Sequence, residues 1–113
     1  MVDSSKTILL TYKKSITIRQ QELDFLKPGR WLNDNVISFY LTYLIDKMSL
    51  AAVATSIDPA AVSCMKFSDD DELNDMFGCL NLSSYELVLV PLNNSTSVSK
   101  SGDHWTMLVC FKD

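Results

Sequence analysis

The pattern of hydrophobic and polar positions is clearest in the middle of the chain, where Trp31 to Met48 is predicted to form a helix. Within it, Ile37, Leu41 and Leu44 recur at intervals of three or four residues and make one apolar stripe. Aromatic and β-branched residues widen this stripe, so we expect the helix to be buried over much of its surface. Asn33 can cap its start by accepting a hydrogen bond from a free backbone N–H group.

Shorter elements are predicted before this helix. The segment from Thr7 to Arg19 is rich in Ile, Leu, Thr and Tyr and is interrupted by two lysines, which favours a bent strand or a hairpin. Gln20 to Leu26 can form one helical turn, which Pro28 and Gly29 would stop.

After the long helix, the small residues of Ser49 to Ile57 are predicted to form a linker. Asp58 followed by Pro59 is typical of a helix start, because the missing N–H of proline has no cost at the first helical position. We expect this short helix to run to about Met65. A second short helix is predicted over Ser68 to Gly78, because its acidic first turn suits the helix dipole and glycine is a common helix stop.

The C-terminal third alternates between apolar and polar segments. Glu86 to Leu92 is almost entirely apolar and is predicted to be a buried strand. The polar segment Asn93 to Asp103 is predicted to be a loop, and His104 to Phe111 a second buried strand. A strand, several helices and two further strands in this order indicate an α+β domain.

Composition narrows the function classes. A chain of 113 residues suits one domain or part of one. Its net charge of -4 argues against nucleic acid as a partner, since such proteins carry a basic surface. No segment approaches the roughly 20 apolar residues that a membrane span needs, and no signal peptide is recognised. We therefore expect no membrane partner, and a location in the cytoplasm, the nucleus or both.

The cysteines and the histidine limit the available chemistry. Cys64, Cys79 and Cys110 are odd in number and form no CxxC pair, so neither a disulfide framework nor a zinc site is predicted. Each cysteine has apolar neighbours, which favours a small buried side chain. A single histidine, His104, cannot hold zinc alone, and no metal or other cofactor is expected.

His104 has two interpretations on its position alone. An imidazole with an unperturbed pKa of about 6.5 suits general base catalysis near neutral pH. The alternative is a half-buried histidine at the end of a strand, with no chemical role.

Two motifs change this balance. The segment from Gly102 to Val109, Gly-Asp-His-Trp-Thr-Met-Leu-Val, resembles the His-Trp strand of the ubiquitin-like-protein-specific cysteine proteases. Trp31 to Asp34, Trp-Leu-Asn-Asp, resembles the start of that family's long helix, and the two motifs occur in the family's order. The resemblance implies the N-terminal half of a papain-like cysteine protease domain over residues 1–113, ending just after the histidine strand.

Within this family the chain most resembles the deneddylase branch. The long loop from Asn93 to Gly102 before the histidine is one feature, since the SUMO proteases have a shorter connection there. The helix start at Asp58 to Ala60, followed by Asp71 to Phe77, is the other. The resemblance implies a partner of the cullin-neddylation type, a ubiquitin-like modifier with its conjugates, which the protease cleaves after the Gly-Gly tail.

The resemblance also implies roles for four residues. His104 would be the base that takes a proton from the cysteine thiol, and Trp31 and Trp105 would form the walls of a tunnel that admits only the Gly-Gly tail. Asp34 would hydrogen-bond the tail near that tunnel. The alternatives are a packing role for each tryptophan and a charge placed for the helix dipole at Asp34.

The family's catalytic triad runs His, Asp, Cys in chain order, with the Asp on the strand after the histidine strand and the Cys later. This sequence departs from the family at the Asp and Cys positions. Asp113 follows His104 too early in the sequence, where the strand ends, to orient the imidazole. Cys64 and Cys79 precede the histidine, and Cys110 lies about 20 Å along its strand. We therefore expect no peptidase activity from the chain as given.

Three alternatives follow from this departure: part of an active protease, a form that binds a modifier without cleaving it, or a vestigial α+β domain.

Under all three alternatives, the His104 strand has apolar residues on both faces. We expect this strand to present an unpaired edge and an exposed apolar face, which favours self-association.

Overall fold

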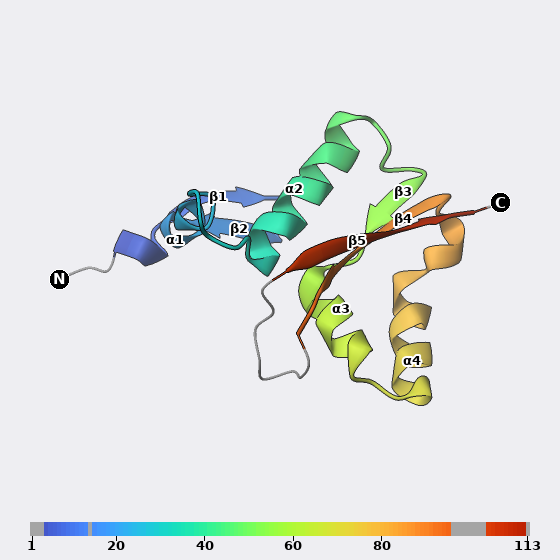
Figure 1. The fold of residues 1–113 in the computed structure, drawn as a ribbon. Coiled ribbons are helices and arrows are strands. Elements are labelled where there is room, and N and C mark those ends of the chain that lie inside the picture. The colour runs from blue at the N-terminus through green and yellow to red at the C-terminus, as the bar shows by residue number, and fades with distance from the viewer. Residues whose placement is uncertain (1–3, 14, 96–103, 113) are drawn as a thin grey trace.

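A computed structural model describes residues 4–13, 15–95 and 104–112 of the chain. The chain forms an N-terminal hairpin with a short helix, then a long helix, then a three-stranded sheet with two further helices (Figure 1). The elements are, in order, η1 Ser4–Lys6, β1 Ile8–Tyr12, β2 Ile16–Arg19, α1 Gln20–Asp24, α2 Asp34–Lys47, β3 Ala54–Ser56, α3 Pro59–Lys66, α4 Asp70–Leu80, η2 Leu82–Ser84, β4 Leu87–Asn93 and β5 Trp105–Phe111. The predicted α+β class is confirmed. No helix in these described ranges is long and apolar enough to cross a membrane.

The N-terminal hairpin is anchored to α2 by a buried carboxylate. β1 and β2 pair antiparallel, which confirms the hairpin alternative. Glu22 on α1 is buried, and one of its oxygens accepts a hydrogen bond from the Arg19 backbone N–H at 2.9 Å. Asn35 on α2 donates to the other oxygen at 3.3 Å and also to the Thr17 carbonyl. These bonds offset the desolvation of the Glu22 charge and fix the start of α2 beside β2.

The other end of α2 is also held by the hairpin. Tyr12 donates to Asp46 Oδ2 at 2.6 Å, and Lys13 Nζ lies 2.7 Å from the same oxygen. The hydrogen bonds from Lys13 and Tyr12 hold the pKa of Asp46 below its usual range, and the bond to Asp46 raises the pKa of Tyr12. Tyr12 also packs edge-on against Phe39 and Tyr43.

The long helix differs from its prediction in two ways. It begins after Trp31, because Asn33 is the N-cap and accepts from the Val36 N–H at 2.9 Å, as predicted for the cap. The expected extensive burial of this helix is wrong, since none of its residues is buried. The hairpin and the sheet cover only part of its circumference, and an open groove runs along another part.

The segment predicted as a linker contains strand β3, which pairs parallel with β4. Ala54 is almost fully buried in this strand, where close packing accommodates only a small side chain. The predicted start of α3 is confirmed, because Asp58 accepts from the Ala60 N–H at 2.8 Å and Pro59 follows it.

Helix α4 continues past its predicted end. Asp69 caps the start by accepting from the Glu72 N–H at 2.9 Å. Gly78 lies inside the helix, and Asn81 ends it with a left-handed φ of 51°. Asparagine tolerates this conformation better than most residues with a side chain, so it takes the position that glycine usually occupies.

The sheet has the order β3-β4-β5, with β4 and β5 antiparallel in a register from Leu87 opposite Phe111 to Asn93 opposite Trp105. Pro91 lies inside β4, where a missing N–H would normally break the ladder. Its nitrogen points to the β3 side, and the last bond on that side runs from Ile57 N–H to the Leu89 carbonyl. The proline therefore lies beyond the end of β3, where no donor is needed.

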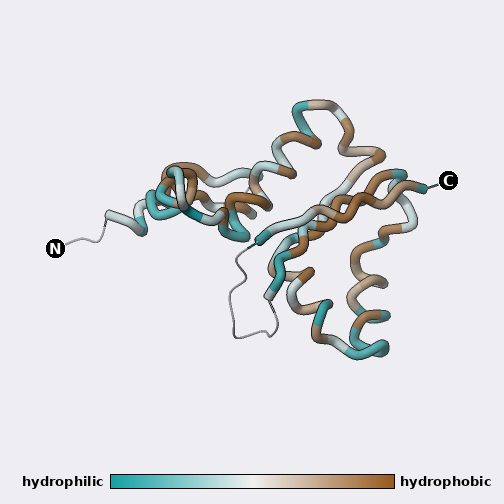
Figure 2. The backbone as a smooth tube through the Cα atoms, viewed as in Figure 1, coloured by the Kyte–Doolittle hydropathy of each residue, from teal (hydrophilic) through white to brown (hydrophobic). Residues whose placement is uncertain are grey.

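The core lies on the face of the sheet that α3 and α4 cover, around Ile57, Val62 and Val88. Strand β5 was predicted to be buried, and this is wrong: Trp105 is half-buried, and all later residues of the strand are exposed. Leu108 is 50 % and Phe111 77 % exposed. Hydrophobic residues continue along both β4 and β5 (Figure 2), but β5 is the edge strand of the described sheet. The expected exposed apolar edge is confirmed.

Candidate functional site

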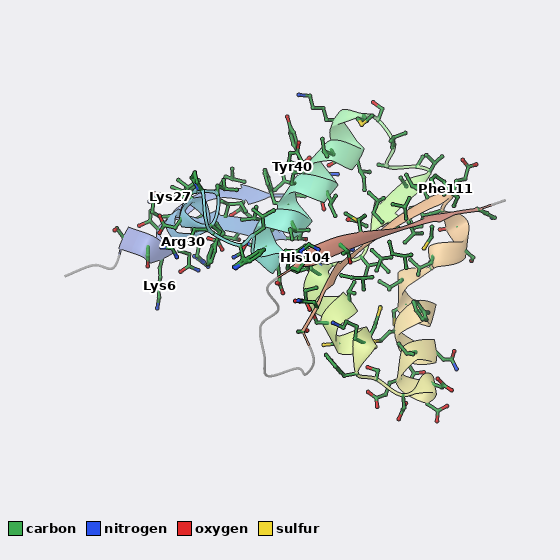
Figure 3. The ribbon with its side chains drawn as sticks, viewed as in Figure 1. Lys6, Lys27, Arg30, Tyr40, His104 and Phe111 are labelled. Carbon is green, nitrogen blue, oxygen red and sulfur yellow. The ribbon has the colours of Figure 1, made fainter. Side chains whose placement is uncertain are left out.

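His104 lies immediately before β5, near the N-terminal end of α2 (Figure 3). Its backbone N–H donates to Asn94 Oδ1 at 3.2 Å, and its carbonyl accepts from the Asn94 N–H at 3.2 Å. Its side chain is exposed, and no residue in the described ranges hydrogen-bonds its imidazole. The backbone of His104 is therefore fixed, while its exposed imidazole can contact a group that is not part of the described chain.

The two motifs found in the sequence meet at one hydrogen bond. Trp105 Nε1 donates to the Leu32 carbonyl at 2.8 Å, across 73 positions of the chain. Leu32 follows Trp31, which is 59 % exposed. The bond places the helix start that carries Trp31 beside the strand that carries His104.

An apolar groove of about 630 Å³ opens between α2 and β5. Its lining includes Leu32 and Trp105, the two residues that join the motifs. No charged side chain lines it, so the groove suits an apolar or uncharged segment rather than an ion. The other lining residues are Leu26, Val36, Ile37, Phe39, Tyr40, Leu41, Pro91, Thr106 and Met107.

Asp34 is the first residue of α2 and is exposed. A carboxylate at this position is stabilised by the helix dipole. No hydrogen-bond partner for it lies in the described part of the chain. The structure places Asp34 near the junction of the two motifs, and its contact with a modifier tail stays a prediction.

The three cysteines were expected to be buried, and all three are exposed. Helices α3 and α4 each turn only one side to the core, and Cys110 lies on the edge strand. Cys110 pairs with Val88 at the far end of the ladder from Trp105. Asp113 and most of the predicted loop from Asn93 to Gly102 lie outside the described residues. Within the described ranges, no cluster of His, Cys, Asp or Glu could hold a metal ion.

Asn94 is a contributor to the site that the sequence did not reveal. The sequence placed Asn94 only within the predicted polar loop from Asn93 to Asp103. In the structure the Asn94 backbone and side chain each bond the His104 backbone. Asparagine side chains often bond backbone groups, but usually ones about two positions away, and His104 follows Asn94 by 10 positions. No local signal therefore indicated this partner.

Replacing Trp105 with Phe tests the bond that joins the motifs. Trp105→Phe keeps an aromatic ring but removes the N–H donor, so we expect the free energy of unfolding to fall by about 0.5–1.5 kcal/mol. Urea denaturation followed by circular dichroism measures this loss. Trp31→Phe is the matched control, because it changes an exposed indole and keeps the bond from Trp105 to Leu32. Equal losses in the two variants would contradict the importance of that bond.

Comparison with known proteins identifies the fold. No family model matches the chain. The solved structure of "SUMO protease Ulp1 with the catalytic cysteine oxidized to a sulfenic acid" matches with a TM-score of 0.68 and 19 % identity. The match covers 95 % of this chain and 45 % of that one. The fold is therefore that of the N-terminal part of a SUMO-protease-type cysteine protease domain.

Two curated relatives define the family more closely. The chain is 32 % identical over 117 residues to "Probable sentrin-specific protease 8" of Dictyostelium discoideum, a match that covers 96 % of this chain and 48 % of the relative. It is 31 % identical to "NEDD8-specific protease 1" of Arabidopsis thaliana, covering 93 % of this chain and 47 % of that protein. The chain belongs to the ubiquitin-like-protein-specific (sentrin/SUMO) protease family and corresponds to its N-terminal part. It spans about half the length of the curated relatives it matches.

Proposed function

We propose that this chain is the histidine-bearing part of a cysteine protease that cleaves after the Gly-Gly tail of a ubiquitin-like modifier. The observation that carries the proposal is the hydrogen bond from Trp105 to the Leu32 carbonyl, which joins the Trp31 and His104 motifs at one end of the apolar groove. His104 is the general base in this proposal. Trp31 and Trp105 form the walls around the tail, and Asp34 bonds its backbone.

The proposed modifier is the ubiquitin-like protein that is attached to cullins in neddylation. A relative named NEDD8-specific protease supports this choice, because it matches almost the whole chain. The observed start of α3 at Asp58 and Pro59 agrees with the feature that pointed to this branch. SUMO is the second candidate, since the matching solved structures are SUMO proteases. Initial rates on the two modifier precursors distinguish these candidates, and equal rates would contradict the branch assignment.

We propose further that the 113-residue polypeptide does not hydrolyse these substrates by itself. Acyl transfer in this family needs a thiolate beside the base. No thiol hydrogen-bonds the His104 imidazole in the described ranges, and Cys110 lies about 20 Å away along β5. The alternative is a module that binds a modifier without cleaving it.

Complementation tests the proposed function. The polypeptide is mixed with the second half of the Dictyostelium relative, and cleavage of a modifier precursor and of a fluorogenic Gly-Gly amide is followed. We expect no cleavage by either half alone and cleavage by the mixture. A stable complex that cleaves neither substrate would contradict the protease proposal. Cleavage by the polypeptide alone that is lost on Cys64→Ser, Cys79→Ser or Cys110→Ser would show that it contains its own nucleophile.

A further inference from the structure

A lysine on α3 binds the turn that follows β4. Lys66 Nζ lies 2.7 Å from the Asn93 carbonyl oxygen and 2.9 Å from the Ser95 carbonyl oxygen. Longer contacts of 3.4 Å reach Asn93 Oδ1 and Ser95 Oγ. A lysine ammonium has three donors, and here two of them have short bonds to backbone carbonyls of one turn.

The turn that Lys66 binds is the one that holds His104. Asn94, the residue between the two carbonyls, makes the pair of 3.2 Å bonds with the His104 backbone. Asn93 Nδ2 also contacts Ser63 Oγ on α3 at 3.2 Å. A continuous set of bonds therefore runs from α3 through the turn to the backbone of His104.

These bonds are expected to affect local order more than a usual contact of an exposed lysine does, because they lie at the end of the β4–β5 ladder. Exposed lysines commonly contribute little to stability, because water competes for the ammonium. The His104 end of the ladder, however, belongs to an exposed edge strand and has little packing to prevent fraying. In the described ranges Lys66 has no salt bridge to a carboxylate, and both of its short hydrogen bonds are made to this turn.

We propose that Lys66 is a positioning residue that fixes the backbone of His104 through the Asn93–Ser95 turn. The functional meaning of this inference rests on the proposed role of His104 as the base. A displaced imidazole would slow proton transfer, because reaction rates fall steeply when catalytic groups leave their productive geometry. Binding of the tail would be unaffected, since Lys66 does not line the apolar groove to which the proposed wall Trp105 belongs.

The chain offers a matched control for Lys66. Lys112 Nζ contacts the Ser83 carbonyl at 3.1 Å, and Lys112 lies at the opposite end of the same β4–β5 ladder. Lys66→Met and Lys112→Met each remove one ammonium; the first removes two lysine-to-carbonyl contacts and the second removes one. Lys66→Arg keeps the charge and the donors. Amide hydrogen exchange, followed to single residues by mass spectrometry at submicromolar concentration, compares these three variants with the wild type.

We expect Lys66→Met to speed exchange of the Asn94 and His104 amides by about three- to tenfold. Exchange at Val90 and Leu108, in the middle of the ladder, is expected to stay within twofold of the wild type. Lys66→Arg should restore much of the protection, and Lys112→Met should leave the His104 end unchanged. Unchanged exchange in Lys66→Met would overturn the proposal. So would faster exchange over the whole ladder, because that indicates general destabilisation. If Lys66→Met does not fold, Lys66→Gln is read by the same criteria.

Activity in the complemented protease gives a second measurement. Lys66→Met should lower kcat by about three- to tenfold with KM unchanged, and Lys66→Arg should recover most of the rate. A higher KM with normal kcat would overturn the positioning role. If the complemented wild type is inactive, the proposed function fails, and the exchange measurements still decide whether Lys66 positions His104.

Discussion

Purified alone, the 113-residue polypeptide is expected to self-associate at micromolar concentration. The reason is the free edge of β5. Lys112 N–H bonds Glu86 and Asn94 N–H bonds His104, so the even-numbered residues of β5 turn their backbone groups to β4. Trp105, Met107, Val109 and Phe111 therefore turn theirs outward. An edge of this length without a charged residue is a template for pairing with another strand.

A single added charge should reduce this association. Val109→Lys places an ammonium in the middle of the free edge, where pairing of two copies would bring like charges together. Met48→Lys is the matched control, because it adds the same charge at another exposed apolar position, the C-cap of α2. Light scattering after size exclusion measures the mass of each variant. We expect a shift towards monomer in Val109→Lys only, and binding of an apolar dye should fall in parallel.

Two results would contradict this expectation. A wild-type chain that is monomeric, melts cooperatively and binds no apolar dye would show that the edge needs no partner. The modifier-binding alternative would then be favoured over the proposal that the chain is part of a protease. Co-expression with the second half of a relative is expected to increase the soluble yield, since that half is the candidate cover for the edge.

The largest catalytic effect is expected for His104→Ala in the complemented protease. Removal of a general base lowers the rate by about 100- to 10,000-fold. The variant should keep the melting temperature and the modifier affinity of the wild type, because the imidazole is exposed and has no hydrogen-bond partner in the described ranges. Initial rates on a Gly-Gly amide, with Lys112→Met as the control, measure the loss.

Trp31→Ala should behave differently from His104→Ala. Loss of a tunnel wall is expected to raise KM more than it lowers kcat, because it removes binding of the tail. A Trp31→Ala variant with normal kinetics and normal stability would contradict the tunnel role. Residual turnover near the wild-type rate in His104→Ala would remove the histidine from the mechanism.

Local signals in the sequence predicted most elements of the fold. Asn33 and Asp58 cap the helices whose starts they indicated, because capping depends on residues only a few positions apart. Asp69 caps α4 one position after its predicted start at Ser68. The pattern missed β3, because Ala-Thr-Ser has no run of large apolar residues and its pairing with β4 is not local. It also misplaced the end of α4, since Gly78 and Asn81 can both serve as stops.

Burial was harder to predict than secondary structure. An apolar strand such as β5 indicates that cover is needed, but it does not show whether the described chain supplies that cover. The site shows the same limit. The motifs at Trp31 and His104 were recognised, and their meeting in space was only implied by resemblance. The contacts of Lys66 and Asn94 depend on how α3 packs against the end of β4, which no local pattern encodes.

The bond between Trp105 and Leu32 has a consequence for the order in which the molecule folds. Its partners are 73 positions apart, and closing a flexible loop of that length costs about 4 kcal/mol in chain entropy. The hairpin β1–β2 and the α2 helix need only nearby residues, so they can form early. During synthesis the groove cannot form until Trp105 has left the ribosome. Until then, the apolar side of α2 that faces the groove remains open to chaperones.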